Sequence, residues 1–143
     1  MSDNSGDRLI FLILTAQHLL KKRLQDEFRR EEVLITPSHT GILFTLEEKG
    51  PQSMNTLSES LFIKNSTVTG LIDRLEKNRL VRRNSVGGDR RAWNISITEK
   101  GLEELDKART IIHRINNEIK EGHSEADIQG MKNVLGTFFS KFS

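Results

Sequence analysis

Cationic side chains gather in the middle of this chain. Between positions 64 and 91, eight lysines and arginines stand against three acidic residues, an excess of five positive charges, whereas the whole chain of 143 residues carries a net charge of +2. The cations are Lys64, Arg74, Lys77, Arg79, Arg82, Arg83, Arg90 and Arg91. Such an asymmetry is typical of a surface that binds phosphate groups, and a solvated charged face is the alternative interpretation.

An apolar stripe predicts that the first of these cations lie on one helix. The stripe comprises Val68, Leu71, Ile72 and Leu75, which share a face at 100° per residue. We expect the helix to be capped by Asn65 or Ser66 and to end near Asn78. Its outward side is small and polar at first and cationic further along, and it carries Ser66, Thr67, Thr69, Gly70, Asp73, Arg74 and Lys77.

This outward side suits the major groove of double-stranded DNA. Serine and threonine hydroxyls can donate to phosphates or base edges, Arg74 can bind guanine or phosphate, and Lys64 adds a cation at the start of the helix. Gly70 costs about 1 kcal/mol relative to alanine inside a helix, which either close approach to DNA or simple tolerance would explain. Asp73 would repel phosphate unless it is paired, and Lys77 is its expected partner four residues on.

A basic hairpin follows the helix. Trp93, Ile95 and Ile97 alternate with polar residues as in a half-buried strand, and residues 81–84 are the expected partner strand, with Gly87 and Gly88 at the turn. We expect Arg82 and Arg83 to bind phosphates. The tip carries Asp89, Arg90 and Arg91, where an arginine can enter the minor groove while Asp89 holds an arginine in place. An exposed surface ion pair is the alternative for the tip.

Two further helices complete a winged helix-turn-helix. Thr36 and Pro37 predict the start of one helix, which Gly50 and Pro51 end, and Ser53 can cap a short helix through Leu61. The short helix, a turn and the cationic helix form a helix-turn-helix. We therefore expect a DNA-binding lobe over residues 36–98, with its wing over about 81–97.

Long amphipathic helices lie on both sides of this lobe, over residues 7–33 and 99–142. Thr98 and Ser124 are expected N-caps in the second range, and the apolar residues recur every three or four positions. The expected fold is mainly α with a small β-wing, about six helices in a single domain over residues 1–143. The terminal helices would expose a large apolar surface on a monomer, so we expect a two-fold homodimer rather than a helical extension packed within one chain. The predicted interface residues are Leu9, Ile13, Ile112, Ile115, Ile119, Leu135, Phe138, Phe139 and Phe142.

Composition excludes several classes of protein. The chain has no cysteine, so it has no disulfide, thiolate metal site or cysteine redox switch. The apolar run 9–14 is too short to span a membrane, and we expect a cytoplasmic protein with no membrane partner. No nucleophile elbow or phosphate-cradling glycine loop is present, so we expect neither enzymatic activity nor a cofactor.

The histidines leave two alternatives open. His18, His39 and His113 lie on three different predicted helices, and a metal-responsive regulator could use them, although no short histidine spacing supports a metal site and we assign none. His18 and His39 are also weak candidates for contacts to a small ligand. A winged helix that binds protein instead of DNA is the other alternative.

The cationic region resembles the MarR family of bacterial transcription regulators. The resemblance rests on Leu71–Lys77, Leu80–Arg83, Asp89–Arg91 and Ile97–Gly101, and it covers essentially the whole chain. It implies an obligate triangular dimer with winged lobes at two corners and intertwined terminal helices at the apex. It also implies operator binding as a repressor or activator, tuned by a small aromatic or anionic effector.

The chain departs from the family pattern in two places. Gly70 replaces the basic or larger polar residue that is common on the recognition helix, so one base contact would be missing. Asn78 and Arg79 stand where the helix usually ends in glycine, and we expect Asn78 to adopt the left-handed conformation that ends the helix.

Overall fold

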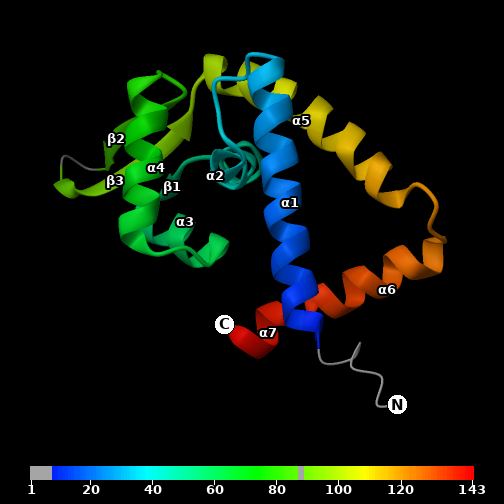
Figure 1. Cartoon of the computed structure of the whole chain (residues 1–143). Coiled ribbons are helices and arrows are strands. Elements are labelled where there is room, and N and C mark those ends of the chain that lie inside the picture. Colours follow the sequence, from blue (N-terminus) through cyan, green and yellow to red (C-terminus); the bar gives the residue numbers. More distant parts are fainter. Residues whose placement is uncertain (1–7, 87–88) are drawn as a thin grey trace, which may run out of the picture.

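The computed structural model describes residues 8–86 and 89–143, with side chains described for residues 8–85 and 93–143. Within these residues the chain forms helices and one small sheet, arranged as in Figure 1. They are α1 (Leu9–Arg30), α2 (Pro37–Lys49), β1 (Gln52–Ser53), α3 (Met54–Leu61), α4 (Asn65–Lys77), β2 (Val81–Val86), β3 (Asp89–Ile97), α5 (Glu99–Lys120), α6 (Glu125–Gly136) and α7 (Phe138–Phe142). The mainly helical fold with a small wing is confirmed.

Hydroxyl caps fix most of the helix starts where the sequence predicts them. The side-chain oxygens of Ser53, Thr98 and Ser124 accept hydrogen bonds of 3.0–3.1 Å from backbone N–H groups three residues on. The start of α4 differs, because Lys64 is its N-cap and makes no side-chain capping bond with any described residue. The predicted cap at Asn65 or Ser66 was therefore wrong, since both residues already belong to the helix.

The end of α4 also differs from the prediction. Asn78 has an ordinary φ of −87°, and Arg79 takes the left-handed conformation with φ of +61°. The Arg79 N–H then bonds to the Glu76 carbonyl at 2.9 Å, and the Leu80 N–H bonds to the Leu75 carbonyl at 2.9 Å. This left-handed residue turns the chain from α4 into β2.

A three-stranded antiparallel sheet supports the wing, in the order β1-β3-β2. The pair β2–β3 begins at Val81 opposite Ile97, and β1 pairs Gln52 with Ile95 on the other edge of β3. The short strand β1 was not predicted. Since β1 directly precedes α3, it ties the start of the helix-turn-helix to the wing.

One apolar core joins the predicted DNA-binding lobe to parts of α1 and α5. Its buried members come from every element from α1 to α5 except β1, and they include Phe28, Ile42, Leu57, Ile72, Leu80, Ile95, Leu105 and Ile111. The predicted stripe of α4 is confirmed, with Val68, Ile72 and Leu75 buried and Leu71 packed at the edge. The first half of α5 therefore belongs to the same core as the helix-turn-helix.

Buried carboxylates fasten the long helices. Glu27 of α1 accepts hydrogen bonds from Arg30 at 3.0 Å and from Arg114 of α5 at 2.9 Å, although its side chain is buried. Glu104 of α5 accepts the Leu34 backbone N–H at 2.8 Å and the Lys107 ammonium at 2.9 Å, a bond that raises the pKa of Lys107. Paired in this way, the buried charges are compensated.

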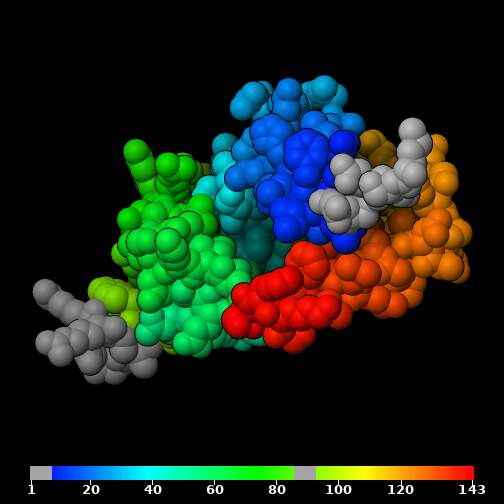
Figure 2. All heavy atoms as spheres, turned by 60° about the horizontal axis from the view of Figure 1, so that its bottom comes forward, coloured from blue at the N-terminus to red at the C-terminus, as the bar shows by residue number. Residues whose placement is uncertain are grey.

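The helices at the C-terminus lie apart from the core. Every residue of α6 and α7 is exposed or half-buried, and α7 reaches back across the molecule to the start of α1 and to the turn between α3 and α4 (Figures 1 and 2). There the ring of Phe139 lies 5.4 Å from the ring of Phe62. The last predicted helix is divided at Thr137 into α6 and α7, so the described residues form seven helices where about six were expected. None of these helices is both long enough and apolar enough to cross a lipid bilayer.

Candidate nucleic-acid interface

The helix α4 presents one uninterrupted polar face to solvent. Its inner side is held by the buried stripe, and all seven residues predicted for the outward side are exposed. Gly70 lies in the middle of this face, and a side-chain methyl added there would meet open space within the described part of the chain. Packing among the described residues therefore does not explain the glycine.

Asp73 on this face is paired with the wing and not with its own helix. The Arg83 guanidinium of β2 forms an ion pair with the Asp73 carboxylate, and its Nε lies 3.6 Å from Oε2 of Glu76. The predicted partner Lys77 was wrong, because the strand β2 passes close enough to α4 for its arginine to reach both carboxylates. Arg82, the neighbouring residue on the strand, is exposed.

The wing tip falls partly outside the described residues. The backbone of β3 begins at Asp89, and the pairing with β2 jumps from Ser85 opposite Trp93 to Val86 opposite Asp89, so three residues of β3 form an irregularity there. The side chains of Asp89, Arg90 and Arg91, and the turn residues 87 and 88, lie outside the described residues. The roles predicted for them remain predictions from the sequence.

The start of α5 closes the base of the lobe on the end of α4. The Thr98 hydroxyl donates to the Arg79 carbonyl at 2.7 Å, and the Lys100 ammonium donates to the Asn78 carbonyl at 3.1 Å. Gly101 is buried here, and a methyl group in its place would collide with the Leu80 carbonyl oxygen and lie 2.8 Å from Cγ1 of Ile97. The run Ile97–Gly101 thus joins the wing, the end of α4 and the start of α5.

His39 of α2 is a buried histidine. Its Nδ1 accepts the Thr36 backbone N–H at 3.0 Å, while its Nε2 has no hydrogen-bond partner among the described residues. Burial lowers the pKa of His39, and the positive charge of Arg74 lowers it further. The ring is therefore neutral and serves as part of the cap of α2, a role that its position three residues after Thr36 could have suggested.

The candidate histidines are not brought together. His18 and His113 are exposed on α1 and α5, whereas His39 is buried in α2. Among the described residues, no three histidine, aspartate or glutamate side chains are grouped to hold a metal ion.

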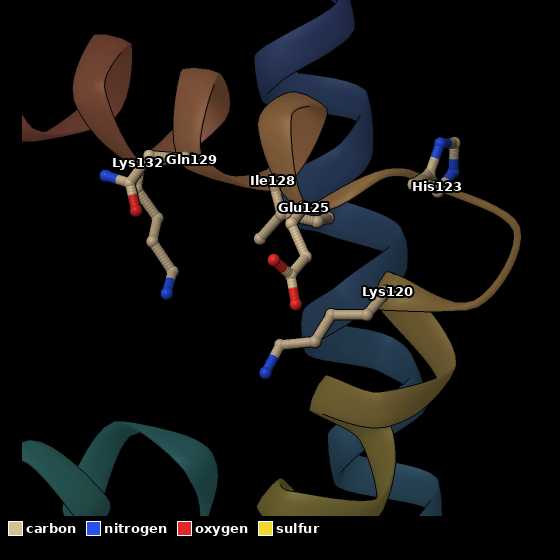
Figure 3. A pocket seen from close by; sticks show the side chains of 6 residues that line it. All are labelled: Lys120, His123, Glu125, Ile128, Gln129 and Lys132. Atoms are coloured by element: carbon tan, nitrogen blue, oxygen red, sulfur yellow. The ribbon is translucent and has the colours of Figure 1, made fainter.

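Two of the surface hollows that lie outside the α4 face involve the middle of α1 and the start of α6. One, of about 280 Å³, lies between α1 and α2 and is lined by Gln17, Leu20, Lys21, Leu24, Pro37 and Ser38. The other, of about 320 Å³, lies at the corner between α5 and α6. In Figure 3 the side chains of Lys120, Glu125 and Lys132 point into the second hollow, and His123 points away from it. Neither hollow contains His18 or His39 in its lining.

The predicted dimer residues fall into two groups. Ile115 is buried in the core of its own chain, whereas Ile112 packs against that core and is half-buried. Ile13 and Phe138 are half-buried, and the remaining residues are exposed: Leu9, Ile119, Leu135, Phe139 and Phe142. The exposed group lies on α1, the end of α5, α6 and α7.

Comparisons with known proteins agree with this architecture. Residues 35–93 match the model of the MarR family. The transcriptional repressor MdtR of Bacillus subtilis is 30% identical over 113 residues, which cover 76% of this chain and 73% of MdtR. The transcriptional regulator PecS of Dickeya dadantii is 34% identical over 100 residues, covering 66% of this chain and 59% of PecS.

Solved structures share the fold over nearly the whole chain. A MarR family protein from Bacillus stearothermophilus matches with a TM-score of 0.72 at 26% identity, covering 99% of this chain and 97% of that one. MepR of S. aureus, solved in complex with DNA, matches with a TM-score of 0.83 at 21% identity over 94% of this chain and 98% of that one. This chain therefore belongs to the MarR family of transcriptional regulators, which are not enzymes.

Proposed function

We propose that the chain acts as a homodimeric, sequence-specific DNA-binding repressor on an inverted-repeat operator. The observation that carries this proposal is the polar face of α4, whose residues are exposed along its length and which lies beside the basic strand β2. An exposed polar helix of this width fits a major groove, and the adjacent cations fit the flanking phosphates.

The relatives support the same function. MdtR and the Pseudomonas putida protein IacR are named transcriptional repressors, and MepR has been solved with DNA bound to the same fold. By similarity, we assign α4 to the groove and the wing to the backbone and minor groove, with Lys64, Arg74, Arg82 and Arg91 as the principal cations.

The apolar surface of the terminal helices supports a dimer. Large apolar side chains are exposed on the first half of α1 and on α6 and α7, among them Leu9, Phe11, Leu14, Val134 and Phe142. Soluble monomers rarely expose a continuous apolar surface of this kind. A second copy of the chain would cover these helices about a two-fold axis and place two α4 helices on one face.

The test is selection of duplexes from a random-sequence library, followed by titration of the selected duplex. We expect inverted half-sites about 10 base pairs apart, centre to centre, a dimeric mass in solution, and a loss of orders of magnitude in affinity between about 50 and 200 mM salt. A protein-binding winged helix would select no duplex, and a monomer would give no inverted repeat.

We also propose that a small anionic effector binds in the hollow between α1 and α2. Lys21 supplies a cation at its rim, and Leu20, Leu24 and Pro37 supply apolar surface for an aromatic ring. Benzoate is a suitable probe. It should raise the melting temperature of the dimer and weaken operator binding, and Lys21→Ala should abolish both effects while Lys22→Ala should not.

A further inference from the structure

Arg83 is bound by carboxylates of the protein itself, although it lies in the most basic part of the chain. Its guanidinium is ion-paired with Asp73 and lies close to Glu76, both on α4. The Arg83 side chain is 28% exposed, whereas that of Asp73 is 58% exposed, so the carboxylate faces solvent more openly than the arginine that compensates it. Arg83 thus stands behind the recognition face and not on it.

The Asp73 carboxylate would oppose DNA binding if no cation compensated its charge. It lies on the same outward side of α4 as Ser66, Gly70 and Lys77, where it would approach the phosphate backbone. A carboxylate near phosphate is repelled, and this repulsion is strong where DNA excludes water. Within the described residues, Arg83 is the cation that forms an ion pair with Asp73.

We propose that Arg83 is a positioning residue for DNA binding, which neutralises Asp73 and Glu76 and fastens β2 to α4 without contacting phosphate itself. This proposal rests on the DNA-binding function proposed above. It also replaces the phosphate contact expected for Arg83 from the sequence and leaves that role to the exposed Arg82.

A contribution to folding stability does not by itself account for the ion pair between Arg83 and Asp73. Ion pairs between partly exposed groups contribute little to folding, because solvent screens them and ordering two side chains costs entropy. Loss of Arg83 should therefore leave thermal unfolding nearly unchanged. Its effect should appear when phosphates approach the uncompensated carboxylates.

The effect of R83Q on binding of the selected duplex, measured in two backgrounds, distinguishes a positioning role of Arg83 from a direct phosphate contact. We expect R83Q to weaken binding more than tenfold without changing the slope of log affinity against log salt. In the D73N/E76Q background the same substitution should change affinity less than threefold, because no carboxylates remain to be compensated. The matched control R82Q should lower the salt slope by about one in both backgrounds, as expected for a lost phosphate contact.

Other results would overturn the proposal. Equal losses from R83Q in both backgrounds, together with a shallower salt slope, would identify Arg83 as a phosphate contact. No loss from R83Q in the wild-type background would show that Asp73 needs no compensation. Circular dichroism must show that the variants are folded. If R83Q is not folded, the neutral substitution R83M in the wild-type and D73N/E76Q backgrounds provides the same comparison. Wild-type protein that binds no duplex would instead overturn the proposed function.

Discussion

Arg79 shows how a single backbone angle can differ from the sequence expectation. An asparagine adopts the left-handed conformation more readily than an arginine, which made Asn78 the expected residue. The structure places the positive φ one residue later, because the Arg79 and Leu80 N–H groups must reach the carbonyls of Glu76 and Leu75. The chain carries local strain there that a glycine would relieve.

We therefore expect Arg79→Gly to stabilise the protein by up to about 1 kcal/mol, measured by urea unfolding. Part of the gain is offset by the greater freedom of glycine in the unfolded chain. Asn78→Gly is the matched control and should destabilise the protein, since Asn78 has a φ that any residue adopts. Stabilisation by the control and not by Arg79→Gly would contradict the assignment.

His39 makes stability depend on pH. The pKa of His39 is lowered in the folded protein, so below about pH 6.5 the unfolded chain binds a proton more readily than the folded one. Stability contributed by the neutral ring is present above that pH and is lost as the pH falls towards the folded pKa. Protonation would also place a donor against the Thr36 N–H.

The comparison with His39→Gln isolates this effect. Glutamine can still accept the Thr36 N–H as a capping-box residue and does not titrate. Thermal melting between pH 7 and pH 5 should show a smaller fall in melting temperature for the variant than for the wild type. Parallel curves for the two proteins would show that His39 titrates normally.

Arg91 is one of the wing residues for which the sequence predicts a DNA contact. Because a wing arginine can enter the narrow, strongly negative minor groove, we expect Arg91→Ala to weaken operator binding at least tenfold while leaving the dimer intact. A gel shift at physiological salt, with light scattering as the control for assembly, tests this. Unchanged affinity would remove Arg91 from the interface.

At the scale of elements, the joint at the start of α5 is the most constrained part of the lobe. Gly101 leaves no room for a methyl group, because the Leu80 carbonyl oxygen and Ile97 fill the space where it would lie. Backbone cannot move aside as a flexible side chain can. The need for glycine here comes from close packing between helix and strand and not from a positive φ.

Gly101→Ala should destabilise the protein by about 3 kcal/mol in urea unfolding, at the upper end of overpacking effects. The control is Gly70→Ala, also inside a helix but facing open space, which should stabilise the protein by about 1 kcal/mol. A small effect of Gly101→Ala would mean that α5 can shift away from Leu80 and from Ile97 of β3. If Gly70→Ala weakens DNA binding despite the added stability, close approach to DNA explains the glycine.

Elements with local signals could be predicted from the sequence, and elements fixed by distant contacts could not. Pro37 marks the start of α2, and the hydroxyls of Ser53, Thr98 and Ser124 cap α3, α5 and α6. These caps could be predicted because the N–H groups that they bind lie three residues away. The strand β1 has two residues and forms only by pairing with β3, so no local pattern marks it. The pairing of Asp73 with Arg83 was missed for the same reason, since it depends on how β2 passes α4.

Buried charge was the other feature that the sequence did not reveal. Glu27 and Glu104 sit in helices at positions that look like solvated surface, and nothing local distinguishes them from their exposed neighbours. Their burial follows from the packing of α1 and of the α1–α2 connection against α5. The outward face of α4, by contrast, could be predicted, because its buried stripe fixes which side remains exposed.

At the scale of the whole molecule, α6 and α7 have apolar residues with too little of their own chain to cover them. We expect Leu135→Glu to shift the protein from dimer to monomer in sedimentation and to weaken operator binding more than tenfold, because two half-sites would no longer be bound together. Gln129→Glu adds the same charge to an exposed position of α6 and should leave both unchanged. A dimeric Leu135→Glu variant would place the interface elsewhere.

The sheet order β1-β3-β2 has a mechanical consequence for the proposed dimer. β1 leads directly into α3 and β2 follows α4, so the two helices of the helix-turn-helix are anchored to opposite edges of β3. Each lobe would then move as a rigid body. An effector would act by changing the distance between the two α4 helices. One extra base pair between half-sites turns the second by about a tenth of a revolution and moves it ~3.4 Å along the axis. Because each lobe is rigid, the affinity of the proposed dimer for an operator should depend on the spacing of its half-sites.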